Sequence, residues 1–90
     1  MKNISDLIPI VSSYLTKNRE HLKKYNECIC IHCGEKFRFM DITDWIDGDR
    51  TALCPKCSLD TVVPIQVHTR TDEFVMSDKL LEEIKKLYGG

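Results

Sequence analysis

The 90-residue chain has no long apolar run and no strong excess of charge of one sign. No stretch approaches the roughly 18 consecutive apolar residues of a membrane span. Its 13 lysines and arginines against 14 aspartates and glutamates leave a formal charge of −1, so no strongly basic balance indicates a phosphate-backbone partner. The composition therefore predicts a soluble protein, and the length predicts a single domain over 1–90.

The chain also lacks the residue patterns of an enzyme and of a secretory signal. Catalysis needs a nucleophile with a base and a pocket, or a metal with an open coordination position, and no spacing in this sequence provides either. Asp6 and Pro9 interrupt the apolar stretch at the start. We therefore expect a non-catalytic protein of the cytoplasm, where spaced cysteine pairs are typically metal ligands and not disulfides.

Against these absences stand five cysteines, four of them in two pairs with the same spacing. Cys30 and Cys33 form one Cys-x2-Cys motif, and Cys54 and Cys57 form another. Each motif is typical of a tight turn around a metal, here called a knuckle, and two knuckles supply the four thiolates of a tetrahedral zinc site. Because four protein ligands leave no position for water, the sequence predicts one structural Zn²⁺ ion.

The residues alone leave alternatives open for this site. The four thiols also suit iron in a rubredoxin-like site, or a redox dithiol. Cys28 or His32 is a conceivable alternate ligand. We favour Cys28 as a buried strand residue, because its distance from Cys30 in the sequence does not match the knuckle spacing, and His32 as a side chain that faces solvent.

Apolar periodicity predicts a helix at each end of the chain. From Ile4 to Tyr25 apolar residues recur mostly at three- and four-residue steps, so 1–25 is predicted as one amphipathic helix that starts at Ser5 or at the Ile8-Pro9 step. A closing helix is predicted over 77–88, with Ser77 as its N-cap.

Between the helices, residues 26–67 are predicted to form a zinc ribbon on a short antiparallel sheet, which makes the whole chain a small α+β protein. The predicted strands are 27–31, 36–39, 51–53 and 61–67. Pro64 confines the last strand to an edge, and a hairpin turns at Gly34. A short helix is predicted over 41–48, with Trp45 packing beside Phe37 and Phe39 or over the metal site, and 68–76 is predicted as a loop.

The position after each second cysteine commonly needs a positive φ, which glycine adopts without a Cβ clash. Gly34 meets this need in the first knuckle, but Ser58 stands there in the second. A non-glycine residue in the left-handed region costs about 1–2 kcal/mol, so the second knuckle is predicted to be slightly strained or differently turned.

Several of these motifs together resemble a known family. The residues that carry the resemblance are Cys30-x-x-Cys33-Gly34, the Phe37/Phe39 strand, Trp45, Asp47 and Gly48, Thr51-Ala52-Leu53-Cys54-Pro55-x-Cys57 and Asp60-Thr61-Val62. Through these motifs, the segment from Cys30 to Val63 resembles a family of small, uncharacterised bacterial cytoplasmic zinc-ribbon proteins. The resemblance implies a cytoplasmic zinc protein without an established activity, to which the N-terminal helix is an added element.

Two functions follow from this pattern, and a protein-interaction or adaptor module is the favoured one. A ribbon of this size is expected to leave part of the N-terminal helix uncovered, so Val11, Tyr14, Leu15 or Leu22 is predicted to pack against a second copy or another protein. The alternative is a nucleic-acid-binding regulatory protein. It would use a basic hairpin with Phe37 or Phe39 as a stacking platform, and its cations would be Lys36, Arg38, Arg50 and Lys56.

Overall fold

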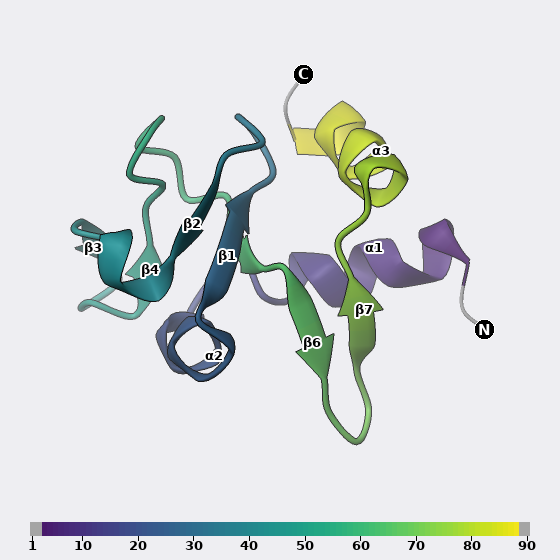
Figure 1. Ribbon diagram of the computed structural model, residues 1–90, viewed down its shortest axis with the longest axis horizontal. Coiled ribbons are helices and arrows are strands. Elements are labelled where there is room, and N and C mark those ends of the chain that lie inside the picture. Colours follow the sequence, from purple (N-terminus) through teal and green to yellow (C-terminus); the bar gives the residue numbers. More distant parts are fainter. Residues whose placement is uncertain (1–2, 89–90) are drawn as a thin grey trace.

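Three helices and three short antiparallel sheets make up the part of the chain that the computed structural model describes, residues 3–88 (Figure 1). The elements follow one another as α1 (Ile4–Ser12), α2 (Arg19–Tyr25), β1 (Glu27–Cys30), β2 (Lys36–Arg38), the 3-10 turn η1 (Phe39–Asp41), β3 (Trp45–Ile46), β4 (Thr51–Ala52), β5 (Val62–Pro64), β6 (Gln66–His68), β7 (Glu73–Val75) and α3 (Asp78–Tyr88). The predicted α+β class with short antiparallel sheets is confirmed.

The central sheet has the order β2-β1-β5, and its two faces contact different cores. Successive residues of a strand point to opposite faces. In β1, Ile29 belongs to one core cluster while Cys28 and Cys30 belong to the other, and β5 divides its residues Val63 and Val62 in the same way. The first core also contains residues of α1, α3 and the β6–β7 hairpin, whereas the second contains Leu22 of α2, Ala52 of β4 and the cysteine region.

The N-terminal helix is broken, so the prediction of one helix over 1–25 is wrong. α1 ends at Ser12 and α2 begins at Arg19. Between them Lys17 takes a φ of 48°, and Asn18 is completely buried. Its amide nitrogen donates to the carbonyl oxygens of Tyr14 (2.8 Å) and Val62 (2.8 Å), and its oxygen accepts from Ala52 N–H (3.1 Å). The break therefore lets one polar side chain join the N-terminal region to β4 and β5.

The start of α1 also differs from the prediction. The N-cap is Asn3, whose side-chain oxygen accepts from the N–H of Asp6 (3.0 Å). Pro9 lies inside the helix and does not open it. An interior proline leaves the carbonyl four residues earlier without its helical donor, and here that residue is Ser5, in the exposed first turn. Solvent reaches this turn, so the helix continues through Pro9.

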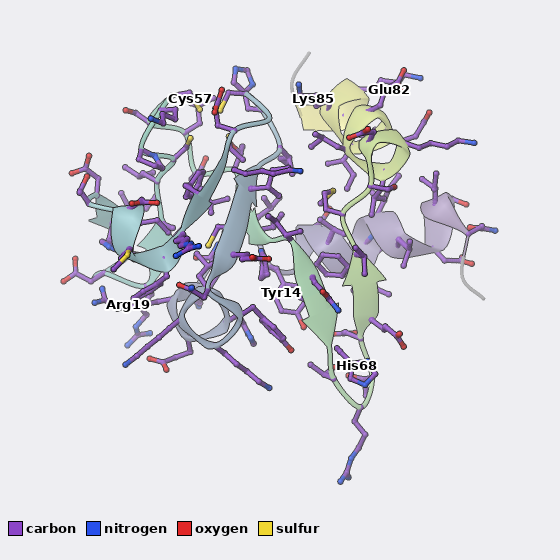
Figure 2. All side chains as sticks on the ribbon, in the orientation of Figure 1. Tyr14, Arg19, Cys57, His68, Glu82 and Lys85 are labelled. Carbon is purple, nitrogen blue, oxygen red and sulfur yellow. The ribbon has the colours of Figure 1, made fainter. Side chains whose placement is uncertain are left out.

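The apolar stripe of the N-terminal region packs into the chain's own core. Val11, Tyr14 and Leu22 are buried, at most 5% exposed, and Leu15 is half-buried against the first cluster. The tyrosine hydroxyl also donates to Oδ2 of Asp72 at the tip of the β6–β7 hairpin (3.0 Å), and Figure 2 shows Tyr14 beside β6. The expected excess of uncovered apolar surface at these residues is therefore absent.

The segment predicted as a helix over 41–48 forms a 3-10 turn and a β-hairpin instead. β3 pairs with β4 through Trp45↔Ala52 and Ile46↔Thr51. Asp47, Gly48 and Asp49 all have positive φ, from 55° to 68°, which reverses the chain within three residues. An apolar spacing of three and four residues over so short a segment does not separate a helix from a turn followed by a strand.

Trp45 is half-buried and packs against Phe39, with ring centroids 5.7 Å apart. The guanidinium carbon of Arg19 also lies over the Trp45 ring, 4.6 Å from its centroid. The predicted packing of Trp45 beside an aromatic residue is therefore observed against Phe39.

The strand predicted over 61–67 is divided, and the loop predicted over 68–76 is a hairpin. β5 ends at Pro64, on the edge of the central sheet as predicted, and β6 begins at Gln66. β6 then pairs with β7 through Val67↔Phe74. Both of these residues are buried between exposed neighbours, so the period of two is real but too short to stand out among the polar residues. The hairpin extends away from the central sheet (Figure 1).

The predicted turn at Gly34, the predicted N-cap Ser77 and the closing helix are confirmed. The β1–β2 hairpin contains Gly34 with a φ of +78°. Ser77 precedes α3 and its Oγ accepts from the N–H of Leu80 (3.1 Å). Leu80 and Ile84 are buried, while the side chain of Glu82 points to solvent (Figure 2). The outward charges and the inward Leu80 and Ile84 give α3 the amphipathic character that the sequence indicates.

Candidate metal centre

The first knuckle starts where β1 ends. The N–H of Gly34 donates to the carbonyl oxygen of Cys30 (2.8 Å), which closes the turn. The N–H of Cys33 is directed at Sγ of Cys30 (3.5 Å), and Cys30 N–H donates to the carbonyl oxygen of Glu35 (3.0 Å). The chain thus wraps around the Cys30 sulfur and presents the Cys33 sulfur on the same side.

The second knuckle repeats this geometry with a different residue at the turn. Ser58 N–H donates to the carbonyl oxygen of Cys54 (2.9 Å), and the N–H groups of Lys56 and Cys57 point at Sγ of Cys54 (3.3 and 3.5 Å). Ser58 has a φ of 65°. Of the two predicted outcomes for this serine, the strained left-handed conformation is therefore the one observed.

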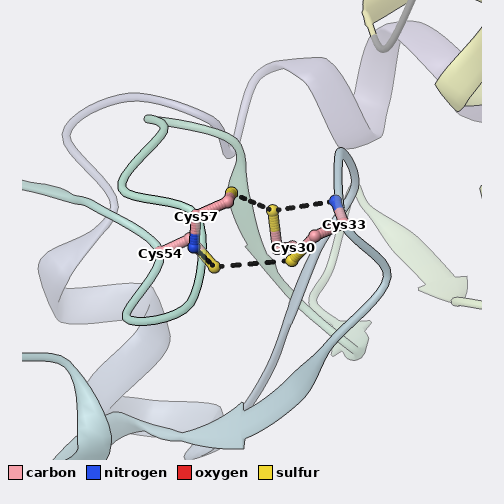
Figure 3. Close-up of side chains that lie close together, drawn as sticks. All are labelled: Cys30, Cys33, Cys54 and Cys57. Atoms are coloured by element: carbon pink, nitrogen blue, oxygen red, sulfur yellow. Dashed lines mark hydrogen bonds between the residues drawn. The ribbon is translucent and has the colours of Figure 1, made fainter.

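Pairing of β1 with β5 helps bring the knuckles together, because the second knuckle leads directly into β5. Cys30 is paired with Val62, and Ile31 N–H donates to the carbonyl oxygen of Thr61 (2.9 Å). The four sulfur atoms all lie within 4.8 Å of one another. The Cys30 and Cys57 sulfurs are 3.6 Å apart, and those of Cys33 and Cys54 are 3.7 Å apart (Figure 3).

These distances fit a metal ion at the centre of the four sulfurs. Zinc–sulfur bonds of about 2.3 Å in a regular tetrahedron place the sulfurs about 3.8 Å from one another. The two cross-knuckle distances are close to this value. No metal ligand besides the four cysteines is needed to complete the shell, so the residues present suit a closed metal site and leave no coordination position for a substrate.

The surroundings favour a negative charge on the Cys30 sulfur. Burial alone would raise the pKa of this thiol, but hydrogen bonds from the N–H of Cys33, the Thr61 hydroxyl at 3.1 Å and the N–H of His32 outweigh it and lower the pKa to about 7. Burial first, and then the neighbouring sulfurs of Cys30 and Cys54, together raise the pKa of Cys57 to about 12. Four thiolates this close repel one another, and a bound dication removes that repulsion.

Thr61 is the contact that sequence reasoning missed. Its hydroxyl supports the Cys30 sulfur from the position just before β5, which no local spacing of cysteines indicates. A threonine beside a strand is too common a feature to be recognised as a partner of a sulfur atom 31 residues away in the sequence.

The two alternate ligands considered from sequence lie outside the group of four. Cys28 is 0% exposed in the second core, and burial, together with the charge of Asp41, raises the pKa of its thiol to about 12. His32 is exposed. The expected positions of both side chains, one in the core and one in solvent, are confirmed.

The residues proposed for a nucleic-acid surface are only partly together. Lys36 and Arg38 are both exposed on β2, but Phe37 between them is 8% exposed and points into the second core. Phe39 packs against Trp45. On β2 the two cations therefore flank a buried Phe37, whose ring is not free for base stacking.

No protein-family model, curated protein or solved structure matches the chain. The resemblance to bacterial zinc-ribbon proteins therefore stays a prediction from the sequence. Among residues 3–88, none of the helices has the length and apolar character that crossing a membrane requires.

Proposed function

We propose that the chain is a zinc ribbon that holds one structural Zn²⁺ ion through Cys30, Cys33, Cys54 and Cys57. The observation that carries this proposal is the convergence of the four sulfurs within 4.8 Å from two knuckles with matching hydrogen bonds. When bound, the ion cross-links the end of β1 to the segment before β5. In such small domains metal binding supplies much of the folding free energy.

Zinc is preferred over iron and over a free dithiol. Four thiolates in a tetrahedron suit both metals, so the preference for zinc over iron follows the sequence resemblance to zinc-ribbon proteins. A reducing cytoplasm, which the same resemblance implies, disfavours the disulfide form of a dithiol. Native mass spectrometry combined with elemental analysis of the purified protein separates the three candidates. One zinc per chain supports the proposal, while iron, or a metal-free chain whose folding is complete, contradicts it.

The proposed role is that of a non-catalytic protein-interaction or adaptor module in the bacterial cytoplasm. A closed thiolate shell supports a structural ion with no reacting position. Val11, Tyr14 and Leu22 are buried in the chain's own core. The contact surface is therefore proposed to be the half-buried side of α1. There Ile4 and Ile8 line a hollow with Lys79 and Glu83 of α3.

A salt-dependent titration separates this role from nucleic-acid binding. We expect no binding of a single-stranded oligonucleotide at low salt, because β2 lacks a free aromatic face. Binding that weakens steeply with added salt and disappears in Lys36→Ser/Arg38→Ser would favour the nucleic-acid function instead. Lys79→Ser/Lys86→Ser is the matched control, since it removes the same charge from α3.

The protein-binding role has its own test. Light scattering at several concentrations reports self-association, and a pull-down reports binding of other proteins. The variant Ile4→Ser/Ile8→Ser is the comparison in both assays. A partner, or a second copy, that is captured by the parent and lost in the variant supports the role. A chain that is monomeric at every concentration and retains no protein contradicts it.

A further inference from the structure

The metal centre pairs one buried sulfur with one accessible sulfur in each of its two close contacts. The first cysteine of each knuckle, Cys30 or Cys54, is buried at 0% and 2% exposure. The second cysteine, Cys33 or Cys57, is half-buried. The contacts cross between the knuckles, so accessible Cys57 lies 3.6 Å from buried Cys30, and accessible Cys33 lies 3.7 Å from buried Cys54.

This arrangement matches what reversible thiol oxidation requires. An oxidant such as hydrogen peroxide reaches exposed sulfurs first, and a second thiol close by converts the product into a disulfide. We propose that Cys33 and Cys57 are oxidation sites, and that Cys54 and Cys30 respectively resolve them into two disulfides that cross between the knuckles. This inference rests on the proposed metal centre, because it describes how that centre is opened.

Each disulfide consumes one peroxide. The accessible thiolate attacks one peroxide oxygen, the O–O bond breaks, and the products are a sulfenic acid and hydroxide. The buried thiolate then attacks the sulfenic sulfur, forms the S–S bond and displaces the second hydroxide. Sulfur is oxidised and peroxide oxygen is reduced. After both pairs have reacted no thiolate remains to hold a metal, so one ion is released for every two disulfides formed.

The fold favours crossing disulfides over disulfides within a knuckle. Each buried sulfur already contacts the opposite knuckle, and the pairing of β1 with β5 holds the two knuckles side by side. A sulfur–sulfur bond is about 2.05 Å long, so each crossing pair has to approach by about 1.6 Å. Crossing bonds replace the cross-link that the ion provides, whereas bonds within a knuckle leave the two segments unlinked.

Trypsin separates the competing linkages, because its cleavage sites fall between the cysteines. Peptide 25–36 contains Cys30 and Cys33 together, while Cys54 lies on 51–56 and Cys57 on 57–70. After treatment of the zinc-loaded protein with peroxide and alkylation of free thiols, crossing disulfides give one species made of all three peptides. Disulfides within the knuckles give 25–36 alone with an internal bridge and 51–56 joined to 57–70, which would overturn the proposal.

Two variants establish which sulfurs pair. In Cys57→Ser we expect peptide 25–36 joined to 51–56 with Cys30 alkylated, and in Cys33→Ser we expect 25–36 joined to 57–70 with Cys54 alkylated. A Cys30–Cys54 or Cys33–Cys57 bond in the parent overturns the assignment. Cys28→Ala is the control, and because this side chain is fully buried, its removal should leave the linkage map unchanged.

Zinc release, followed with a chromogenic chelator, is measured in the same samples. The expected result is one zinc released per two disulfides, and recovery of zinc binding after reduction in the presence of added zinc. Four thiols that all remain alkylatable under peroxide conditions that oxidise free cysteine would overturn the proposal. A preparation that carries no metal before oxidation contradicts the proposed function, while its disulfide map still tests the pairing.

Discussion

Replacement of Asn18 by alanine tests how the broken N-terminal helix is attached to the sheets. The asparagine side chain is completely buried. It donates to the carbonyl oxygens of Tyr14 and Val62 and accepts from the N–H of Ala52, at 2.8, 2.8 and 3.1 Å. It is thus a buried polar link between the α1–α2 connection and strands β4 and β5, beside the bond from Lys17 N–H to Oγ1 of Thr51 (2.8 Å).

Alanine leaves at least the Ala52 N–H without an acceptor, and the carbonyl groups of Tyr14, Leu15 and Val62 lose a donor. A buried polar group without a partner costs about 1–3 kcal/mol. Water that enters the space left by Asn18 recovers part of this cost, so we expect Asn18→Ala to lower the free energy of unfolding by about 2–4 kcal/mol. This is a large part of the 5–15 kcal/mol that typically stabilises a domain.

Urea unfolding of the zinc-loaded protein measures this loss, and the fluorescence of Trp45 reports it. At an m value of about 1–2 kcal/mol per molar, the midpoint should fall by about 2 M. Asn18→Asp is the informative comparison. It keeps the acceptor for Ala52 but turns a carboxylate oxygen toward two carbonyls, so it should destabilise at least as much. An Asn18→Ala variant within about 0.5 kcal/mol of the parent, the range of ordinary surface substitutions, would refute the reasoning.

The remaining predictions concern the knuckle turns and one buried tyrosine. Ser58→Gly should raise the free energy of unfolding by about 0.5–1 kcal/mol, because Ser58 has a φ of 65°, and Gly34→Ala should lower it by about 1 kcal/mol. Equal effects of the same sign in urea unfolding would contradict this. Burial and the hydrogen bond to Asp72 raise the pKa of Tyr14 from 10.0 to about 12, which means that the folded state favours the neutral tyrosine. The stability that this preference adds is complete below pH 10 and is lost as pH rises toward 12. Tyr14→Phe should flatten that part of a stability–pH profile, and an unchanged profile would contradict the assignment.

The four cysteines of the candidate metal site were predictable from the sequence because each pair lies within a four-residue motif. Cys30 with Cys33, and Cys54 with Cys57, carry their geometry in local spacing, and Gly34 marks the turn. Cys28 was predicted to be a buried strand residue because its distance from Cys30 in the sequence does not match the knuckle spacing, and it lies in the second core. The locally encoded features of the candidate site could therefore be predicted. The Thr61 contact could not, because it depends on the pairing of β1 with β5.

The errors in the fold arise where tertiary contacts decide. The periodicity of the N-terminal segment continues across the break at Asn18, because Leu22 of α2 is also buried, although in the other core. The hydrogen bonds that the break makes to the sheets explain it: those of the buried Asn18 side chain to Val62 and Ala52, and that of Lys17 N–H to Oγ1 of Thr51. Similarly, Trp45 and Ile46 fit a helical spacing, and their pairing with Thr51–Ala52 cannot be read from residues 41–48 alone.

The most direct test of the central claim is the metal content and folding of the parent beside Cys33→Ser and Cys54→Ser. Native mass spectrometry should find one zinc ion in the parent, and a chelator should remove it with loss of the cooperative unfolding transition. Both variants should bind zinc weakly and unfold at lower urea than the parent. A parent without metal whose stability equals that of both variants would contradict the account.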